Sequence, residues 1–472
     1  MCPHAPQLQL QRRLAINACT LRKAWLRCSL PVFLLLVCSC GGASAAPGTA
    51  PNVPPAAPPV VAPGDGTLAQ IKHIVIMVQE NRSFDNYFGK LNDYRAAHGL
   101  DASVDGLPPD ASNPTYDGSG TISAYHLRTA CTENSSPSWN ESHAAFNRYN
   151  RTSSVGLMDG FVYTGAKFAI DEGLHDTQGM RVMGYYDWND IPYYYFLATQ
   201  FATSDRWFSP VPANSPANHF YLFAGTSVGH VYSPKTTFSN KTIFELLEEH
   251  GISWRIYETD PGVTFLNYYQ PFGSRHQANI APLGQFLTDV SAGNLPAVAL
   301  IEAGLETGGD EHPSSNVQKG ALQVSTLING LMSSSSWQDS VFILTWDEGG
   351  GVYDHVPFAE AVNPDGIPVT DLRTTDTCYG RPCADFTRTG SRVPLLVVSP
   401  FTKAHYVSHS VADYSAILRF IETRFGLPPL TQRDAAQPDM TEFFDLTNVP
   451  NLAPPQPPAQ PANAPCYKDH LP

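Results

Sequence analysis

Residues 74–89 read IVIMVQENRSFDNYFG, an apolar run that passes directly into polar side chains. Apolar runs without polar alternation are typical of strands that are covered on both faces of a parallel sheet. We therefore predict a buried strand over 73–78. Gln79, Glu80 and Asn81 follow it without a spacer, and we interpret them as ligands rather than core residues.

Further apolar runs of this kind occupy residues 298–303, 341–346 and 395–399. Residues 242–251 and 414–426 carry apolar side chains at helical spacing and end in glycine. Strands that alternate with helices predict an α/β fold. We expect a mostly parallel central sheet with helices on both faces.

Three of the predicted strands lead into polar clusters, and ligands of open α/β sheets bind beyond the carboxyl ends of strands. The clusters are Glu80-Asn81, Asp347-Glu348 and the sequence DEHP at 310–313. Carboxylates gathered in a cleft need a compensating cation. An all-oxygen donor set favours one hard divalent metal, Ca²⁺, Mg²⁺ or Mn²⁺. The alternative is that these residues are turn residues and helix caps.

A nucleophile is predicted in the segment SPVPANSPANHFYLFAGTS, residues 209–227. Ser215 lies there between Asn214 and Pro216, on a predicted turn that can expose a hydroxyl to a cleft. Ser83 competes for this role, and it can equally cap the segment that follows it. A nearby divalent cation would help either hydroxyl to lose its proton.

Three histidines are candidate acid or base groups: His143, His312 and His355. His312 follows Glu311 and His355 follows Asp354, both in loops that contain Gly or Pro, which raises the chance that they point into a site. A structural role is the alternative for each of them. Glycines 349–351 either let backbone N–H groups approach a phosphate or form a flexible turn.

Composition excludes one class of partner. The chain has 472 residues, a formal net charge of −14 and no Lys/Arg-rich run. Nucleic-acid binding relies on clustered cations, so we expect no nucleic acid. The 42% hydrophobic content suits a globular protein with a sizeable core.

The first 45 residues have the charged, apolar and small-residue order of an export signal. Cleavage after residues 43–45 is one outcome, and lipidation of Cys40, which would tether the protein to a membrane, is the other. Residues 46–67 read as a Pro-rich tether, 68–447 as one globular domain and 448–472 as a Pro-rich tail. We therefore expect a protein that is exported to the periplasm, the medium or the cell envelope.

Four of the nine cysteines lie beyond the predicted signal, and four thiols allow three pairings. The stretch CYGRPC can close a local loop between Cys378 and Cys383, which leaves Cys131 for Cys466. A zinc site is the competing interpretation, although the chain has no CxxC motif.

Five segments resemble the bacterial phosphoesterase family that contains non-zinc phospholipases C and certain acid phosphatases, within the alkaline phosphatase-like superfamily. They are IKHIVIMVQENRSFDNYFG, TWDEGGGVYDHVP, DEHPSS, VPLLVVSPF and YSAILRFIETRFGL, and they span about residues 70–427 in the family's order. The family's x-Pro-Asn-Arg segment is matched by SPANH (215–219), which has Ala217 and His219 where Pro and Arg are usual. The His of the family's HSW segment is absent, and His143 lies six residues after Pro137.

The resemblance implies a metal-dependent phosphoric ester hydrolase with Ser215 as its nucleophile. It implies that Glu80, Asn81, Asp347 and Glu348 hold the metal, that His143 or His312 transfers protons, and that the site is also lined by the residues Ser83, Asn218, Glu311, Asp354 and His355.

The substrate class stays open at this point. Broad monoester specificity of the acid phosphatase kind is the leading expectation, and a phospholipase C that acts on phosphatidylcholine-type diesters is the alternative. For the latter, the aromatic stretch at 183–196 can supply a cage for a quaternary amine. An exported protein that only binds phosphorylated ligands is the non-enzymatic alternative.

Overall fold

A central eight-stranded sheet has the strand order β13-β6-β12-β11-β1-β10-β8-β9. Every neighbouring pair in it is parallel except those that β12 makes with β11 and β6. The strands are β1 (His73–Gln79), β6 (Ala202–Ser204), β8 (Trp254–Glu258), β9 (Ile280–Pro282), β10 (Val298–Glu302), β11 (Ser340–Trp346), β12 (Leu395–Val398) and β13 (Tyr406–Ser408).

The computed structural model describes residues 64–304, 307–381, 383 and 386–471. The predicted signal at 1–45, Cys40 and most of the tether at 46–67 lie outside the described residues. Within the described part of the chain, no helix combines the length and the apolarity that crossing a bilayer requires.

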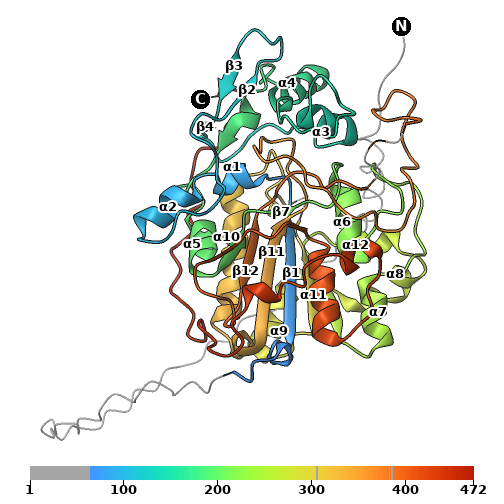
Figure 1. Ribbon diagram of the computed structural model, residues 1–472. Coiled ribbons are helices and arrows are strands. Elements are labelled where there is room, and N and C mark those ends of the chain that lie inside the picture. The colour runs from blue at the N-terminus through green and yellow to red at the C-terminus, as the bar shows by residue number, and fades with distance from the viewer. Residues whose placement is uncertain (1–63, 305–306, 382, 384–385, 472) are drawn as a thin grey trace, which may run out of the picture. The chain divides into compact units, whose positions relative to one another are not determined.

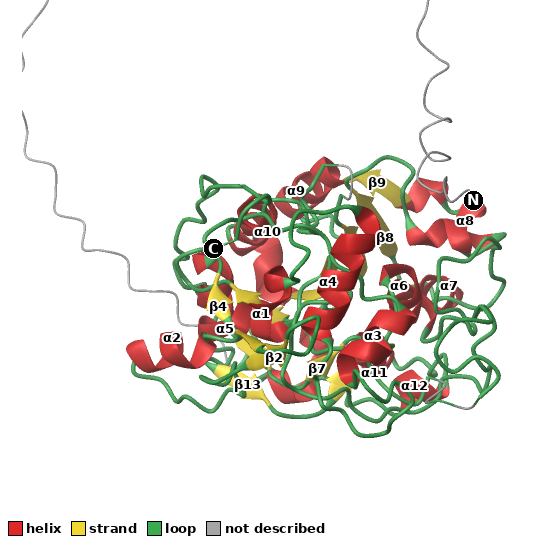
Figure 2. Cartoon of the chain, turned by 90° about the horizontal axis from the view of Figure 1, so that it is seen from above, coloured by secondary structure: helices red, strands yellow, loops and turns green. Residues whose placement is uncertain are grey.

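Twelve α-helices surround the sheet in the part of the chain that the structure describes. Their bounds are α1 (Phe84–Phe88), α2 (Leu91–Ala97), α3 (Trp139–Phe146), α4 (Phe161–Glu172), α5 (Pro192–Gln200), α6 (Ser215–Ala224), α7 (Ile243–Glu249), α8 (Phe272–Arg275), α9 (Leu283–Ala292), α10 (Val317–Met332), α11 (Ala416–Phe425) and α12 (Gln432–Ala435). Helices α9 and α10 lie on one side of the sheet and α11 on the other (Figures 1 and 2). The predicted α/β fold with both faces covered is therefore confirmed.

Buried apolar side chains explain why β1, β10 and β11 lie in the middle of the sheet. All residues of β10 and β11, and all of β1 except His73, are buried. A strand that is apolar on both faces is stable only where helices cover both faces. The sequence predicted these strands correctly, but β12 (the predicted strand at 395–399) is antiparallel to β11.

Among the described residues, three two-stranded sheets lie outside the central sheet. They are β2 (Ser112–Pro114) with β3 (Thr121–Ser123), β4 (Tyr125–His126) with β5 (Gly184–Tyr185), and β7 (Trp207–Phe208) with β14 (Ala412–Asp413). Figure 1 shows β2, β3 and β4 near α3 and α4, beyond the end of the sheet at which α1 begins.

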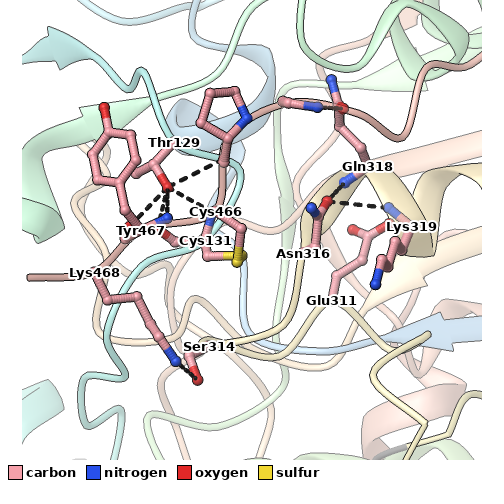
Figure 3. Close-up of a disulfide and its surroundings, with 12 residues drawn as sticks. Thr129, Cys131, Glu311, Ser314, Asn316, Gln318, Lys319, Cys466, Tyr467 and Lys468 are labelled. Carbon is pink, nitrogen blue, oxygen red and sulfur yellow. Dashed lines mark hydrogen bonds between the residues drawn. A yellow bond between two sulfur atoms is a disulfide. The ribbon is translucent and has the colours of Figure 1, made fainter.

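The Pro-rich tail is fixed to the domain by its last residues (Figure 3). Cys466 forms a disulfide with Cys131, 335 residues earlier. Beside it, the Thr129 hydroxyl donates to the Tyr467 carbonyl at 2.8 Å and accepts from the Tyr467 N–H at 2.9 Å. Cys378 and Cys383 form the second disulfide, so the structure has the disulfide pairing rather than a zinc site.

Candidate functional site

The site begins where β1 and β11 end side by side. Gln79 pairs with Trp346 at the last position of the parallel ladder, so Glu80 and Asp347 leave the sheet together. The Asp347 N–H donates to the Gln79 carbonyl at 2.9 Å, and the Asn81 N–H donates to Asp347 Oδ1 at 2.8 Å. The two strand ends are thereby fixed to each other.

Ser215 brings a hydroxyl to these carboxylates from a third element. It is the first residue of α6, which Asn214 precedes in an extended conformation and which Pro216 favours at its start. The Ser215 hydroxyl lies near both Glu80 and Asp347, and its interaction with each of them partly offsets the rise in the pKa of that carboxyl group. The amino end of a helix presents free N–H groups and a positive dipole end, so this position also suits an anion.

Asn81 and Glu348 form a second pair of side chains, next to the pair of Glu80 and Asp347. The Asn81 side-chain amide donates to Glu348 Oε1, and Glu348 Oε2 accepts from the Gly350 N–H at 2.6 Å. Asn81 has a φ of 63°, and Gly350 has a φ of 65°. A Cβ atom on Gly350 would lie 2.4 Å from the Asn81 carbonyl oxygen, so Gly350 permits a close approach of two backbones.

His219 and Asp310 complete the cluster; Asp310 was expected there only as part of the DEHP segment at 310–313, and His219 was not a predicted site residue. His219 Nε2 lies 2.9 Å from Glu80 Oε1 and 3.9 Å from Asp347 Oδ2. The Asp310 carbonyl accepts from the Glu80 N–H at 2.8 Å, and the negative charge of Asp310 contributes to the raised pKa of Glu80.

Burial and mutual repulsion dominate the electrostatics of this cluster. Burial raises the pKa of Glu80 to about 7 and that of Asp310 to about 7. Burial also raises the pKa of Asp347 and of Glu348 well above their usual values; the charge of Glu80 adds to the first shift and that of Asp347 to the second. These carboxyl groups would ionise fully only beside a cation.

A divalent metal fits this donor set. Asp347 Oδ2, Asn81 Oδ1 and Asp310 Oδ2 are buried and have no hydrogen-bond partner. Among the described residues, no Lys or Arg forms an ion pair with Glu80, Asp347 or Glu348. Buried carboxylates are normally paired or coordinate metals. The observations therefore point to a cation bound by oxygens from the ends of β1 and β11.

His312 lies near this cluster, whereas Glu311 faces the core. The His312 N–H donates to Asp310 Oδ1 at 3.1 Å, and burial lowers the pKa of the His312 imidazole. Glu311 accepts hydrogen bonds from the hydroxyls of Tyr87 and Tyr194 and from the indole N–H of Trp346. Glu311 thus holds the loop at 310–313 in place through side chains of the core, and it does not line the cleft.

His143 lies on α3, against Trp139 and the Cys378–Cys383 disulfide. Its Nδ1 is 2.7 Å from the Trp139 carbonyl, and its ring lies near the Cys378–Cys383 disulfide. Burial lowers the pKa of His143 to about 4, which makes the ring a poor proton donor or acceptor near neutral pH. The structure does not bring His143 together with Ser215.

His355 and Asp354 belong to a separate charged network that supports α1. Arg392 Nε donates to Asp354 Oδ1 at 2.9 Å, and Arg392 Nη2 donates to Asp85 Oδ1 at 3.0 Å. His355 lies between Asp85 and Asp105, 2.7 Å from Asp85 Oδ2 and 3.1 Å from Asp105 Oδ1. This network fixes the start of α1, which begins three residues after Asn81.

Ser83 and Asn218 hold backbone in place. The Ser83 hydroxyl donates to the Tyr353 carbonyl at 2.7 Å and caps α1 by accepting from the Asn86 N–H at 3.2 Å. The Asn218 amide donates to the Ala213 carbonyl at 2.8 Å, and its oxygen accepts from the Val211 N–H at 3.1 Å. Asn218 thereby shapes the loop that precedes Ser215.

A narrow cavity opens on the Glu348 side of the cluster. It is lined by residues of α3, of the loop before α6 and of the glycine turn after β11, among them Glu141, Ser142, Ala213, Glu348, Gly349 and Ser391. Glu348, one of the four predicted metal ligands, thus borders this cavity.

Comparison with known proteins places this site in a family. Residues 71–428 match the model of the Phosphoesterase family. The chain is 30% identical over 444 residues to Phospholipase C B of Mycobacterium tuberculosis, with 83% of this chain and 81% of the relative covered. It is 30% identical over 405 residues to Non-specific phospholipase C1 of Arabidopsis thaliana, with 80% and 72% covered.

Among solved structures, an alkaline phosphatase superfamily protein from Vibrio parahaemolyticus matches with a TM-score of 0.35 and 12% identity, covering 74% of this chain and 78% of that one. The sequence relatives identify a hydrolase that acts on phosphoric esters. The chain belongs to the Phosphoesterase family.

Proposed function

We propose that this protein hydrolyses phosphoric esters with Ser215 as its nucleophile, at a metal centre that Glu80, Asn81, Asp347 and Glu348 hold. One observation carries the proposal: the first residue of α6, Ser215, lies near both Glu80 and Asp347, which come from two neighbouring strand ends and whose pKa values its hydroxyl lowers. A bound divalent cation would offset the carboxylate charge and help the hydroxyl to lose its proton.

The chain's own residues account for the remaining steps. Ser215 Oγ passes its proton to a neighbouring carboxylate of the cluster and forms a bond to phosphorus while the bond to the alcohol oxygen breaks, and the N–H groups at the amino end of α6 stabilise the phosphate oxygens. His312, rather than the distant His143, donates a proton to the leaving alcohol. A water molecule then gives a proton to His312 and attacks the phosphoserine; phosphate or a phosphomonoester leaves, and Ser215 Oγ takes back its proton from the carboxylate.

The relatives favour phospholipid-type diesters as substrates. Phospholipases C from a bacterium and a plant each match across most of this chain, so we propose phospholipase C activity first. The sequence alone favoured monoesters. One observation keeps monoesters as the second candidate: Tyr193, Tyr194 and Tyr195 are fully buried, so these tyrosines cannot form an amine cage.

A panel of substrates with and without a chelator distinguishes these candidates. We expect hydrolysis of para-nitrophenyl phosphorylcholine, loss of activity with chelator, and recovery when a divalent metal is added. Preferential cleavage of para-nitrophenyl phosphate would favour the monoesterase. Binding of phosphorylated ligands without turnover under any metal would favour the binding-protein alternative.

Replacement of the nucleophile tests the mechanism. We expect Ser215→Ala to abolish turnover and to leave substrate binding intact, because only the attacking oxygen is removed. Ser83→Ala is the matched control, since Ser83 caps α1 and should affect stability rather than the chemical step. A near-normal rate for Ser215→Ala together with a large loss for Ser83→Ala would overturn the assignment.

A further inference from the structure

His219 shares a helix face with the proposed nucleophile. It lies on α6 four residues after Ser215, and residues at this spacing project from the same side of a helix. Its ring is buried and stacks on Phe265, with ring centroids 4.1 Å apart and planes 11° apart. This packing fixes the ring with Nε2 directed at the carboxylates.

Three donor atoms from three elements converge at this point. His219 Nε2, a Glu80 oxygen and an Asp347 oxygen all lie within 4.8 Å of one another. A hydrogen bond from His219 satisfies Glu80 Oε1 at 2.9 Å, but Asp347 Oδ2 is buried and has no hydrogen-bond partner. A histidine that served only as a hydrogen-bond donor would leave that oxygen unsatisfied.

A metal held by all three residues satisfies every one of these atoms. Imidazole nitrogen suits Zn²⁺ and Fe²⁺, whereas Ca²⁺ and Mg²⁺ select oxygen donors alone. We propose that His219 is a ligand of the metal that Glu80 and Asp347 bind, so that the centre selects a Zn²⁺- or Fe²⁺-type ion over Ca²⁺ and Mg²⁺. The inference rests on the proposed function for the presence of a metal, and it replaces the all-oxygen donor set that the sequence suggested.

Metal affinity measured by calorimetry on the chelator-treated full-length protein tests this proposal. We expect Zn²⁺ to bind more tightly than Ca²⁺, and His219→Gln to weaken Zn²⁺ by at least about tenfold while Ca²⁺ affinity changes little. His219→Cys should restore Zn²⁺ affinity, because thiolate is a zinc ligand and a poor calcium ligand. An unchanged Zn²⁺ affinity in His219→Gln would overturn the proposal, as would a preference of the wild type for Ca²⁺.

His126→Gln is the matched control, because His126 lies near two other carboxylates, Asp187 and Asp190, away from the site. It should leave the tight Zn²⁺ site unchanged; loss of that site in His126→Gln would overturn the proposal. A second measurement does not depend on a variant. The Co²⁺-loaded wild type should show a paramagnetically shifted, exchangeable imidazole proton, and its absence would also refute ligation by His219.

The outcomes separate this inference from the proposed function. If Zn²⁺ affinity depends on His219 but no phosphoric ester is cleaved, the ligand assignment stands and the catalytic proposal fails. If metal-dependent hydrolysis occurs while His219→Gln binds Zn²⁺ as tightly as the wild type, only the ligand assignment fails.

Discussion

Glu422 is a buried acid whose proton links stability to pH. Burial raises its pKa to about 9, and the neighbouring Asp434 contributes to the shift. The folded state therefore keeps a proton that the unfolded state releases above pH 4.5 or so. The stabilisation of the folded state that protonated Glu422 contributes is complete at low pH, and it is lost as the pH rises toward 9.

We predict that Glu422→Gln raises the melting temperature at pH 8 by a few degrees and leaves it nearly unchanged at pH 5, because glutamine needs no proton to remain neutral. Thermal unfolding followed by circular dichroism at both pH values checks this. Glu172→Gln, at an exposed position on α4, should show no such difference. An equal shift at both pH values would argue against a titrating Glu422.

Individual site residues were predictable to different degrees. Glu80 and Asp347 could be predicted because each follows a buried strand, and strand ends converge in an α/β sheet. His219 lies inside a helix, and only its four-residue spacing from Ser215 signals that the two share a face. Glu311 was predicted to line the site, and no local signal shows that it instead faces the core, since its partners Tyr87 and Tyr194 come from distant segments.

The glycine turn after β11 acts through close packing. Gly350 and Gly351 both have positive φ, and neither position has room for a side chain. The Gly350 N–H also binds Glu348. From the sequence, we expected glycines 349–351 either to let backbone N–H groups approach a phosphate or to form a flexible turn. In the structure, they allow the segments that follow β1 and β11 to pack closely together.

We predict that Gly350→Ala lowers phosphoesterase activity by at least about a hundredfold, because the added methyl group would displace Asn81 and with it Glu348. Gly366→Ala is the control: its φ is +75°, but its Cβ would meet nothing within 4 Å. Both variants carry similar backbone strain of about 1 kcal/mol. Equal activity losses in the two would show that strain, not contact with Asn81, is responsible.

Strand positions were easier to predict than strand directions. Buried apolar runs identified β1, β10, β11 and β12, because few other structures bury every residue of a short segment. The direction of β12 depends on the segments that connect it to the rest of the sheet. Its own apolar sequence fits a parallel and an antiparallel strand equally well. The short strands β6, β9 and β13, of three residues each, have no comparable apolar run.

At the scale of the whole molecule, the Cys131–Cys466 bridge closes a very long loop. We predict that Cys466→Ser lowers the free energy of unfolding by about 2–4 kcal/mol, because the bridge restricts the unfolded chain. Cys378→Ser opens a bridge of only five residues' separation and should cost less. Denaturant unfolding of both variants and of the reduced wild type measures this. A larger cost for Cys378→Ser would contradict the entropic argument.

The meeting of the two ends of the domain has a further consequence. The Gly64 N–H donates to the Thr447 carbonyl at 2.9 Å, and the Ile71 and Ala69 carbonyls accept from Arg424, all beside the amino end of β1. Ser215 and Asp347 lie beyond its carboxyl end, a seven-residue strand away. A label or fusion partner joined at residue 64 would therefore meet the domain at the pole opposite Ser215 and Asp347, one strand length from the proposed site.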